Sequence, residues 1–192
     1  MELKLKNVRL AFPKLWRAEQ VNGEGKPAFS AAFLIQPTDP QIAEIGRVMK
    51  AVAKEKWGEA KWETMYNQLK ATDKLCLHNG DTKPNIEGYP GNYFINGRNG
   101  VKPLVIDANK APLSESDGKP YGGCYVNCVL ELWAQENKFG KRINATLSGV
   151  QFARNGDAFA GGQAADESAF DDISDTGGDA PAAAPKATAD LF

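Results

Sequence analysis

Histidine and cysteine are scarce in this chain of 192 residues, which has one histidine and three cysteines. Cys76, Cys124 and Cys128 are an odd number of thiols, and their spacing matches no metal-binding pattern. Cys124 and Cys128 lie four residues apart in a strand-like segment, about 13 Å between Cα atoms, too far for a disulfide. His78 lacks the other ligands of a closed zinc site. We therefore expect buried thiols in a reducing compartment, a structural or solvent-exposed His78, and no metal or cofactor.

Long hydrophobic runs are also missing. No segment approaches the ~20 apolar residues that a membrane-spanning helix needs, and no signal-like apolar stretch follows Met1. We therefore expect a soluble, cytoplasmic protein without a membrane partner.

Motifs of the common enzyme classes are absent as well. The glycine-rich stretches lack the spacings that bind phosphates in nucleotide-dependent enzymes, and no serine lies in a nucleophile-elbow pattern. We therefore predict a protein that is not an enzyme. One alternative stays open, because Asp81, Glu87 and Asp107 would hold Mg²⁺ if the fold brought them together. That arrangement would make a metal-dependent nuclease or recombination enzyme acting on DNA.

Charge is divided unevenly along the chain. Residues 1–156 contain 22 Lys and Arg against 16 Asp and Glu, whereas residues 157–192 contain 1 against 8. The second segment is rich in Ala, Gly and Pro and has too few apolar residues to bury a core. We predict one domain over residues 1–156 and a disordered acidic tail over residues 157–192. This layout is typical of a protein that binds a polyanion and carries its own competitor.

Apolar residues alternate in several segments, with a helical pattern between them. Residues 3–10 predict a first strand with a bulge near Asn7, and residues 29–35 predict a second strand after a long connection. From Gln41 the spacing becomes helical, which predicts two amphipathic helices in an insert at about residues 40–71. Short strands follow at 93–95 and 104–106, and two long ones flank a hairpin at 137–141. The pattern predicts a mainly β, α+β protein, either a five-stranded antiparallel OB-fold barrel or a related β-sandwich.

Aromatic and basic residues recur together in the predicted loops and on strand faces away from the core pattern. Single-stranded nucleic acid requires this combination, because cations neutralise phosphates and flat rings stack on bases of any sequence. Trp16, Tyr89 and Tyr93 fit ligand contact and core packing equally well, and Tyr125 and Trp133 could equally pack under the helical insert. The predicted nucleic-acid contacts are Phe12, Lys14, Trp16, Arg17, Lys26, Lys83, Tyr89, Tyr93, Arg98, Lys102, Tyr121, Phe139, Lys141 and Arg142.

Several segments, in order along the chain, resemble a known family. Residues 79–83, 88–95, 121–127 and 147–152, with Gly156 and Phe159 after them, are similar to a phage single-stranded DNA-binding family long catalogued as a domain of unknown function. The resemblance runs from about Lys6 to Phe159. It implies an OB-fold core, sequence-independent binding of single-stranded DNA, and a role in phage replication or recombination in the cytoplasm of a bacterial host.

The acidic segment resembles the tips of bacterial and phage single-stranded DNA-binding proteins. These tips combine carboxylates with hydrophobic residues, as the chain does at Phe170, Asp171 and Asp172 and again at Asp190, Leu191 and Phe192. The resemblance implies that the tail competes with DNA for the basic surface and recruits phage or host replication and recombination proteins. We therefore expect a protein that coats and protects single-stranded DNA. The sequence leaves a homo-oligomer open.

Overall fold

The computed structural model describes residues 1–21 and 24–159. The tail residues named above, at 170–172 and 190–192, lie outside this range. The described elements, in chain order, are β1 (Glu2–Val21), β2 (Glu24–Ile35), α1 (Gln41–Trp57), α2 (Trp62–Ala71), β3 (Leu77–Asn79), η1 (Gly80–Thr82), β4 (Tyr93–Asn99), β5 (Leu104–Ile106), η2 (Glu115–Asp117), β6 (Tyr125–Asn137) and β7 (Gly140–Arg154).

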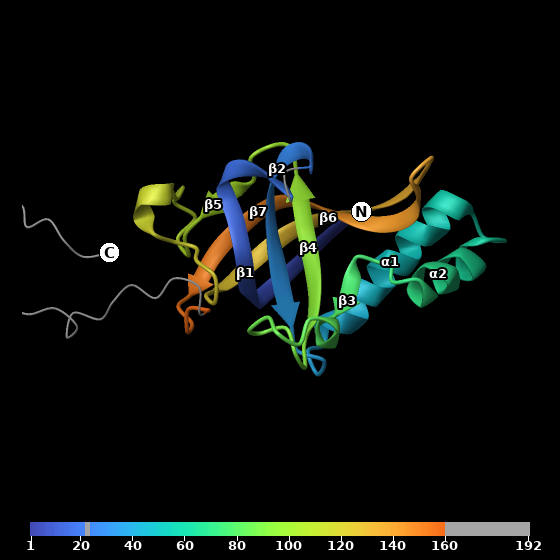
Figure 1. The fold of residues 1–192 in the computed structure, drawn as a ribbon, viewed down its shortest axis with the longest axis horizontal. Helices are drawn as coiled ribbons and strands as arrows, with labels where there is room; N and C mark the ends of the chain where they lie inside the picture. The colour runs from blue at the N-terminus through green and yellow to red at the C-terminus, as the bar shows by residue number, and fades with distance from the viewer. Residues whose placement is uncertain (22–23, 160–192) are drawn as a thin grey trace, which may run out of the picture. The chain divides into compact units, whose positions relative to one another are not determined.

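The described strands form one seven-stranded sheet in the order β3-β4-β2-β1-β6-β7-β5. The pairs are antiparallel except β5 with β7. Figure 1 shows the sheet curling so that β4 lies across β7, while α1 and α2 lie at one end. The predicted mainly β fold with a helical insert is confirmed. The sheet is not a closed five-stranded barrel, because among the described strands no backbone ladder joins β4 to β7.

The prediction that a long connection separates the first two strands is wrong. β1 and β2 stay paired through it, with Lys14 opposite Ser30 and Glu19 opposite Ala28. Three register shifts interrupt this part of the ladder, and Phe12 has a positive φ of 46°. These bulges break the apolar alternation that marks a strand in sequence. The bulge predicted near Asn7 is confirmed by a register shift and a φ of 51°.

The core lies between the inner face of the sheet and the helices. Ile45, Met49 and Val52 of α1 are buried in it at helical spacing, and the apolar face of β6 is buried as predicted. Cys76, Cys124 and Cys128 are free and buried, as predicted. Burial raises the pKa of the Cys76 thiol to about 12. In the described part of the chain no helix is long and apolar enough to cross a membrane.

The folded unit continues past the predicted boundary at residue 156. The Phe159 N–H donates to the Gly122 carbonyl oxygen at 3.1 Å, and the Arg9 guanidinium lies 4.4 Å from the Phe159 ring centre. A Cβ on Gly88 would lie 2.6 Å from the Phe159 ring, so only glycine leaves room for it. The residues up to Phe159 therefore pack with the domain.

Candidate nucleic-acid interface

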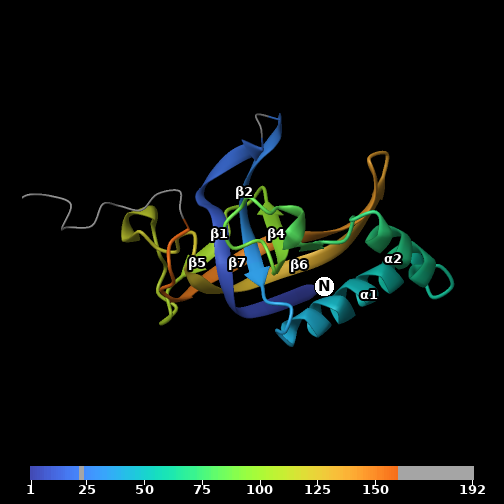
Figure 2. The ribbon, with the colours of Figure 1, turned by 60° about the horizontal axis from the view of Figure 1, so that its bottom comes forward.

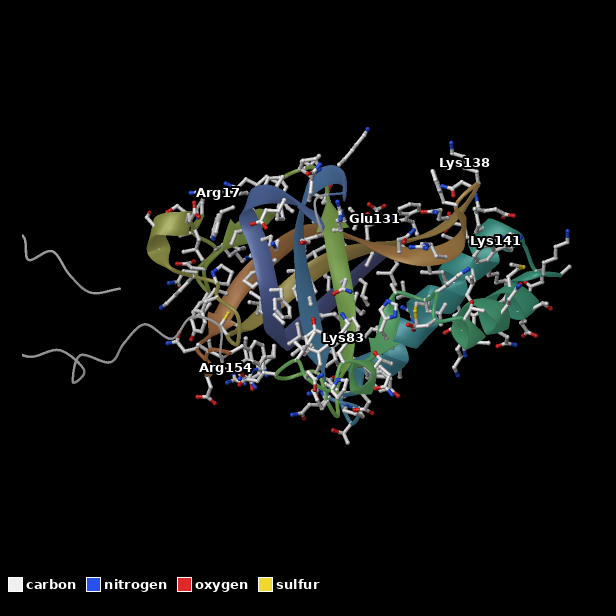
Figure 3. All side chains as sticks on the ribbon, in the orientation of Figure 1. Arg17, Lys83, Glu131, Lys138, Lys141 and Arg154 are labelled. Atoms are coloured by element: carbon white, nitrogen blue, oxygen red, sulfur yellow. The ribbon has the colours of Figure 1, made fainter. Side chains whose placement is uncertain are left out.

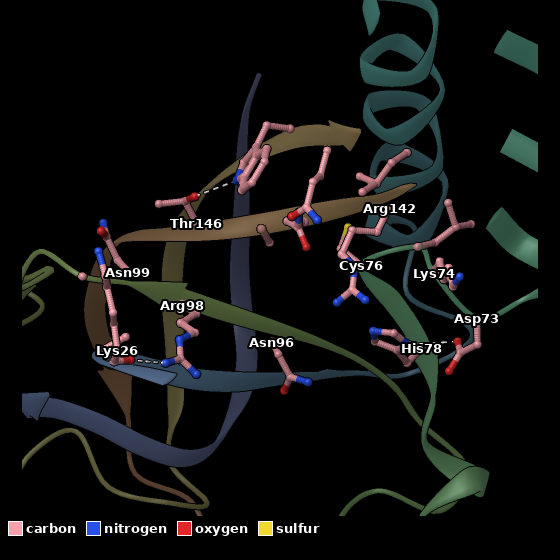
Figure 4. Close-up of a pocket in the computed structure, with 18 of the residues that line it drawn as sticks. Lys26, Asp73, Lys74, Cys76, His78, Asn96, Arg98, Asn99, Arg142 and Thr146 are labelled. Atoms are coloured by element: carbon pink, nitrogen blue, oxygen red, sulfur yellow. Dashed lines mark hydrogen bonds and ion pairs between the residues drawn. The ribbon is translucent and has the colours of Figure 1, made fainter. Parts of the chain in front are cut away.

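A groove of about 560 Å³ opens between β4 and the distal half of the β6–β7 hairpin (Figure 4). We call this cavity the groove. Residues distant in sequence line it: Lys26, Pro27 and Ala28 of β2; Asp73, Lys74, Leu75 and Cys76 before β3; His78 of β3; Asn96, Arg98, Asn99 and Gly100 of and after β4; Trp133 and Gln135 of β6; and Arg142, Ile143, Asn144, Ala145 and Thr146 of β7.

Contacts across the curled sheet fix the two walls of the groove. The Asn99 side-chain amide donates to the Leu147 carbonyl oxygen at 2.8 Å, which ties β4 to β7. The Ile143 N–H donates to the Lys74 carbonyl oxygen at 3.0 Å, which ties β7 to the segment before β3. A Cβ on Gly97 would lie 2.9 Å from a Leu130 methyl carbon. The close approach of β4 to the core therefore requires glycine there.

The groove carries a net positive charge. Lys26, Lys74, Arg98 and Arg142 line it, and Asp73 is the one carboxylate among the lining residues. Asp73 is engaged, since its Oδ1 lies 2.9 Å from His78 Nδ1. Clustered cations on facing walls focus a positive potential that attracts phosphates.

Trp133 supplies an aromatic surface in the groove. Its side chain is 43% exposed, and its Nε1 donates to Thr146 Oγ1 at 3.0 Å, so the indole is held in place. Next to it, the Asn144 amide donates to Gln135 Oε1 at 3.2 Å. An oriented ring beside amide groups and cations is the arrangement that binds a nucleobase and its phosphate together.

Three of the predicted contacts meet in the groove. Lys26, Arg98 and Arg142 come from three different strands, and the Arg98 guanidinium donates to the Lys26 carbonyl oxygen at 2.6 Å. The sequence analysis predicted these cations as nucleic-acid contacts, but it gave no indication that they share one cavity.

The other eleven predicted contacts lie outside the groove. Figure 3 shows Arg17, Lys83 and Lys141 at widely separated edges of the domain. Arg17 pairs with Glu115 at 3.2 Å, and Lys14 pairs with Glu19. The Lys102 ammonium lies 5.4 Å from the Trp16 ring centre. These side chains are occupied by neighbours within the protein.

Three further predicted contacts lie outside the groove, two of them at the tip of the β6–β7 hairpin and one beside the C-terminal segment of the domain. Phe139, at the turn between β6 and β7, is 74% exposed, and Lys141 pairs with Glu136. The Tyr121 hydroxyl donates to the Gly156 carbonyl oxygen at 3.0 Å, and its ring packs on the core. Tyr121 therefore holds the C-terminal segment of the domain.

Tyr89 corrects the sequence prediction most clearly. It is 1% exposed and belongs to a second apolar cluster on the sheet, so its ring has no free face for a base. Phe12, 58% exposed, lies 6.1 Å from it, and Tyr93 is half-buried in β4. The apolar cluster that contains Tyr89 consists of Ala11, Ala32, Leu34, Tyr89 and Phe94, with Ile86 and Phe159 packed against it. We call it the Tyr89 cluster.

Two of the three carboxylates of the nuclease alternative accept hydrogen bonds from the backbone of their own loops. Asp81 accepts from the Gly91 N–H at 2.7 Å, and Asp107 accepts from the Asn109 and Ala111 N–H groups. Within residues 1–21 and 24–159, no group of three His, Cys, Asp or Glu side chains is placed to share a metal ion.

Sequence reasoning missed Trp133, Lys74 and His78 as groove residues. Trp133 lies on the outer face of β6, and from the alternation alone it could equally have packed under the helices. The exposed indole excludes that reading. Tyr125, the other residue in that choice, is half-buried under the Arg154 guanidinium, 3.4 Å from its ring centre. The presence of a polar face beside Trp133, at Gln135 and Asn144, is the signal that could have identified the groove.

The sequence and the fold both match known phage proteins. Residues 1–180 match the family described as Enterobacter phage Enc34, ssDNA-binding protein. The putative protein p50 of Acyrthosiphon pisum secondary endosymbiont phage 1 is 46% identical over 176 residues, which cover 91% of this chain and 95% of that protein.

Two solved structures resemble the domain. The single-stranded DNA-binding protein of bacteriophage Enc34 in complex with ssDNA has a TM-score of 0.71 and 28% identity, covering 83% of this chain and 89% of that one. The gp2.5 single-stranded DNA binding protein of bacteriophage T7 has a TM-score of 0.54 and 14% identity, covering 85% and 91%. The second likeness concerns the fold alone.

Proposed function

The chain belongs to the family of the Enterobacter phage Enc34 ssDNA-binding protein, and we propose that it binds single-stranded DNA in the groove without regard to sequence. The main observation that supports this proposal is that an exposed, oriented indole lies among four cations in one cavity. Trp133 stacks on a base, while Lys26, Lys74, Arg98 and Arg142 neutralise phosphates. Neither interaction depends on the identity of the base.

The biological role that follows is protective and not catalytic. The protein coats single-stranded DNA during phage replication and recombination in the cytoplasm of the bacterial host. Coating by many copies along one strand allows contacts between neighbouring copies, and a homo-oligomer is compatible with this role.

Titration with oligo-dT at several salt concentrations tests the proposal. The observed association constant should fall with salt, with a log–log slope of about 0.7 per phosphate neutralised. Arg142→Gln should weaken binding and lower the slope by about 0.7, because it removes one groove cation. Arg154→Gln is the matched control, since Arg154 lies outside the groove over the Tyr125 ring. Equal slopes for both variants, or no salt-dependent binding by the unchanged protein, would reject the proposal.

The acidic segment is the second part of the proposed function. Its eight carboxylates against one lysine offer the groove the same charge as phosphates, and its hydrophobic residues are available to replication or recombination proteins. Removing residues 160–192 leaves the Phe159 contacts in place and should tighten oligo-dT binding, most strongly at low salt, where charge competition is least screened. Unchanged affinity after this truncation would show that the segment does not compete.

A further inference from the structure

The far wall of the groove belongs to an arm whose two strands pair only with each other, and which is tied to the segment before β3 by the hydrogen bond from the Ile143 N–H to the Lys74 carbonyl oxygen. β6 pairs with β1 up to Glu131, opposite Glu2, and Leu132 exchanges two backbone hydrogen bonds with Met1; beyond Leu132, β6 pairs with β7 alone. We call residues 133–144 the β6–β7 arm. It carries the groove residues Trp133 and Arg142. A two-stranded hairpin is only marginally stable by itself, so its position relative to β4 must be set by other contacts.

Glu136 joins this arm to α1, and its ion-pair partner Lys141 contacts α2. Its Oε2 accepts from Trp57 Nε1, at the end of α1, at 2.7 Å. Its Oε1 pairs with Lys141 Nζ at 2.9 Å, and the same ammonium lies 4.0 Å from Met65 Sδ of α2. The hydrogen bonds from Lys141 and then from Trp57 hold the pKa of Glu136 below its ordinary value, so the carboxylate is charged at neutral pH. Figure 1 shows the hairpin extending beside α1 and α2, as this linkage requires, and Figure 2 shows the same from a second direction.

We propose that Glu136 is a positioning residue for DNA binding, which fixes the β6–β7 arm against α1 and thereby sets the placement of Trp133 and Arg142 across the groove from β4. Glu136 does not line the groove, so it acts through the arm. This inference rests on the proposed function of the groove.

The proposal predicts that replacing Glu136 weakens DNA binding, whereas simple electrostatics predicts that it strengthens DNA binding. Removing an acidic residue from a DNA-binding protein ordinarily strengthens binding, because one repulsion of phosphate is lost. Glu136→Gln keeps the shape of the side chain, but glutamine has one acceptor oxygen, and its NH₂ group must face one of the two donors. Loss of an exposed charged contact of this kind is worth about two- to fivefold in the equilibrium that it biases. Glu136→Gln should therefore bind oligo-dT about two- to fivefold more weakly.

Two variants separate position from charge. Glu131→Gln removes the same charge from the outer face of β6, and the Glu131 side chain makes no hydrogen bond or ion pair with another residue in the described part of the chain. It should bind as tightly as the unchanged protein or slightly more tightly. Trp57→Phe changes no charge, keeps a ring packed against the core and removes the donor to Glu136. It should weaken binding by a similar factor to Glu136→Gln, and adding it to Glu136→Gln should have little further effect, because both remove the same contact.

The experiment measures oligo-dT affinity and its salt slope for the unchanged protein, the three single variants and the Trp57→Phe/Glu136→Gln double variant, together with circular dichroism to confirm that each is folded. Weaker binding by Glu136→Gln and Trp57→Phe, with unchanged salt slopes and non-additive effects, supports the positioning role, since the number of phosphates neutralised stays the same. Any other pattern overturns it, including Glu136→Gln behaving like Glu131→Gln. If the unchanged protein itself does not bind oligo-dT, the proposed function fails instead.

Discussion

The groove and the Tyr89 cluster both combine aromatic rings with cations, but their cations have different partners. In the cluster, Lys83 Nζ lies 4.7 Å from the Phe94 ring centre, and the Arg9 guanidinium lies over Phe159. In the groove, the side chains of Lys74 and Arg142 have no ion pair or hydrogen bond with another described residue. The cations of the cluster therefore lie over its own rings, whereas Lys74 and Arg142 of the groove are accessible to a ligand. Rings and cations lie together in both regions, and the accessibility of those side chains separates the two regions.

The largest expected effect tests whether Tyr89 is structural. Tyr89→Ala removes a ring that is 1% exposed and should cost about 3–5 kcal/mol of unfolding free energy, as truncation of a buried aromatic residue does. Denaturant unfolding measures this change. Oligo-dT affinity of the fraction that remains folded should be close to normal. A stable variant with weak DNA binding would instead place Tyr89 in the interface.

Trp133 provides the opposite test. Trp133→Ala should weaken oligo-dT binding by about 1–3 kcal/mol, the value of one stacked base, with little change in stability because the ring is partly exposed. Phe12→Ala truncates another exposed ring, beside the Tyr89 cluster, and should have a smaller effect on binding. Comparable losses for the two variants in fluorescence-anisotropy titrations would remove the distinction between the two regions.

Gly97 tests how closely β4 must approach the core beneath the groove. Gly97→Ala places a methyl group 2.9 Å from a Leu130 carbon and 3.2 Å from Leu147 Cβ, and overpacking of this kind should cost about 1–3 kcal/mol of unfolding free energy. Gly100→Ala is the control, since its Cβ would meet no atom within 4 Å. Thermal unfolding of both variants gives the comparison. A neutral Gly97→Ala would mean that the two walls adjust freely.

The buried thiols give the smallest expected effect, which is their slow reaction with thiol reagents at pH 8. Burial raises the pKa of Cys76 to about 12 and of Cys124 to about 11, above the ordinary value of 9.0. The thiol form therefore dominates in the folded protein at pH 8, and a thiol reagent should react only as the protein unfolds. Because the pKa values are raised on folding, their contribution to stability is complete below about pH 9 and is lost as the pH rises towards 12. Rapid labelling of native protein at pH 8 would contradict this burial.

The sequence by itself determined the elements that depend on local pattern. Alternation identified the buried face of β6, helical spacing identified α1 and α2, and composition separated a basic domain from an acidic segment. Local pattern failed at the β1–β2 hairpin, where bulges break the alternation and both faces of the paired strands are largely exposed beyond the core.

Only the tertiary structure decided which aromatic and basic residues share a site. Lys26, Arg98, Trp133 and Arg142 meet because the sheet curls and β4 crosses β7 at Gly97, a long-range approach that no local pattern encodes. The same folding buries Tyr89, whose surroundings in sequence are those of a loop. Residue type sets what a side chain is able to bind, whereas the packing of distant strands sets whether it is free to do so.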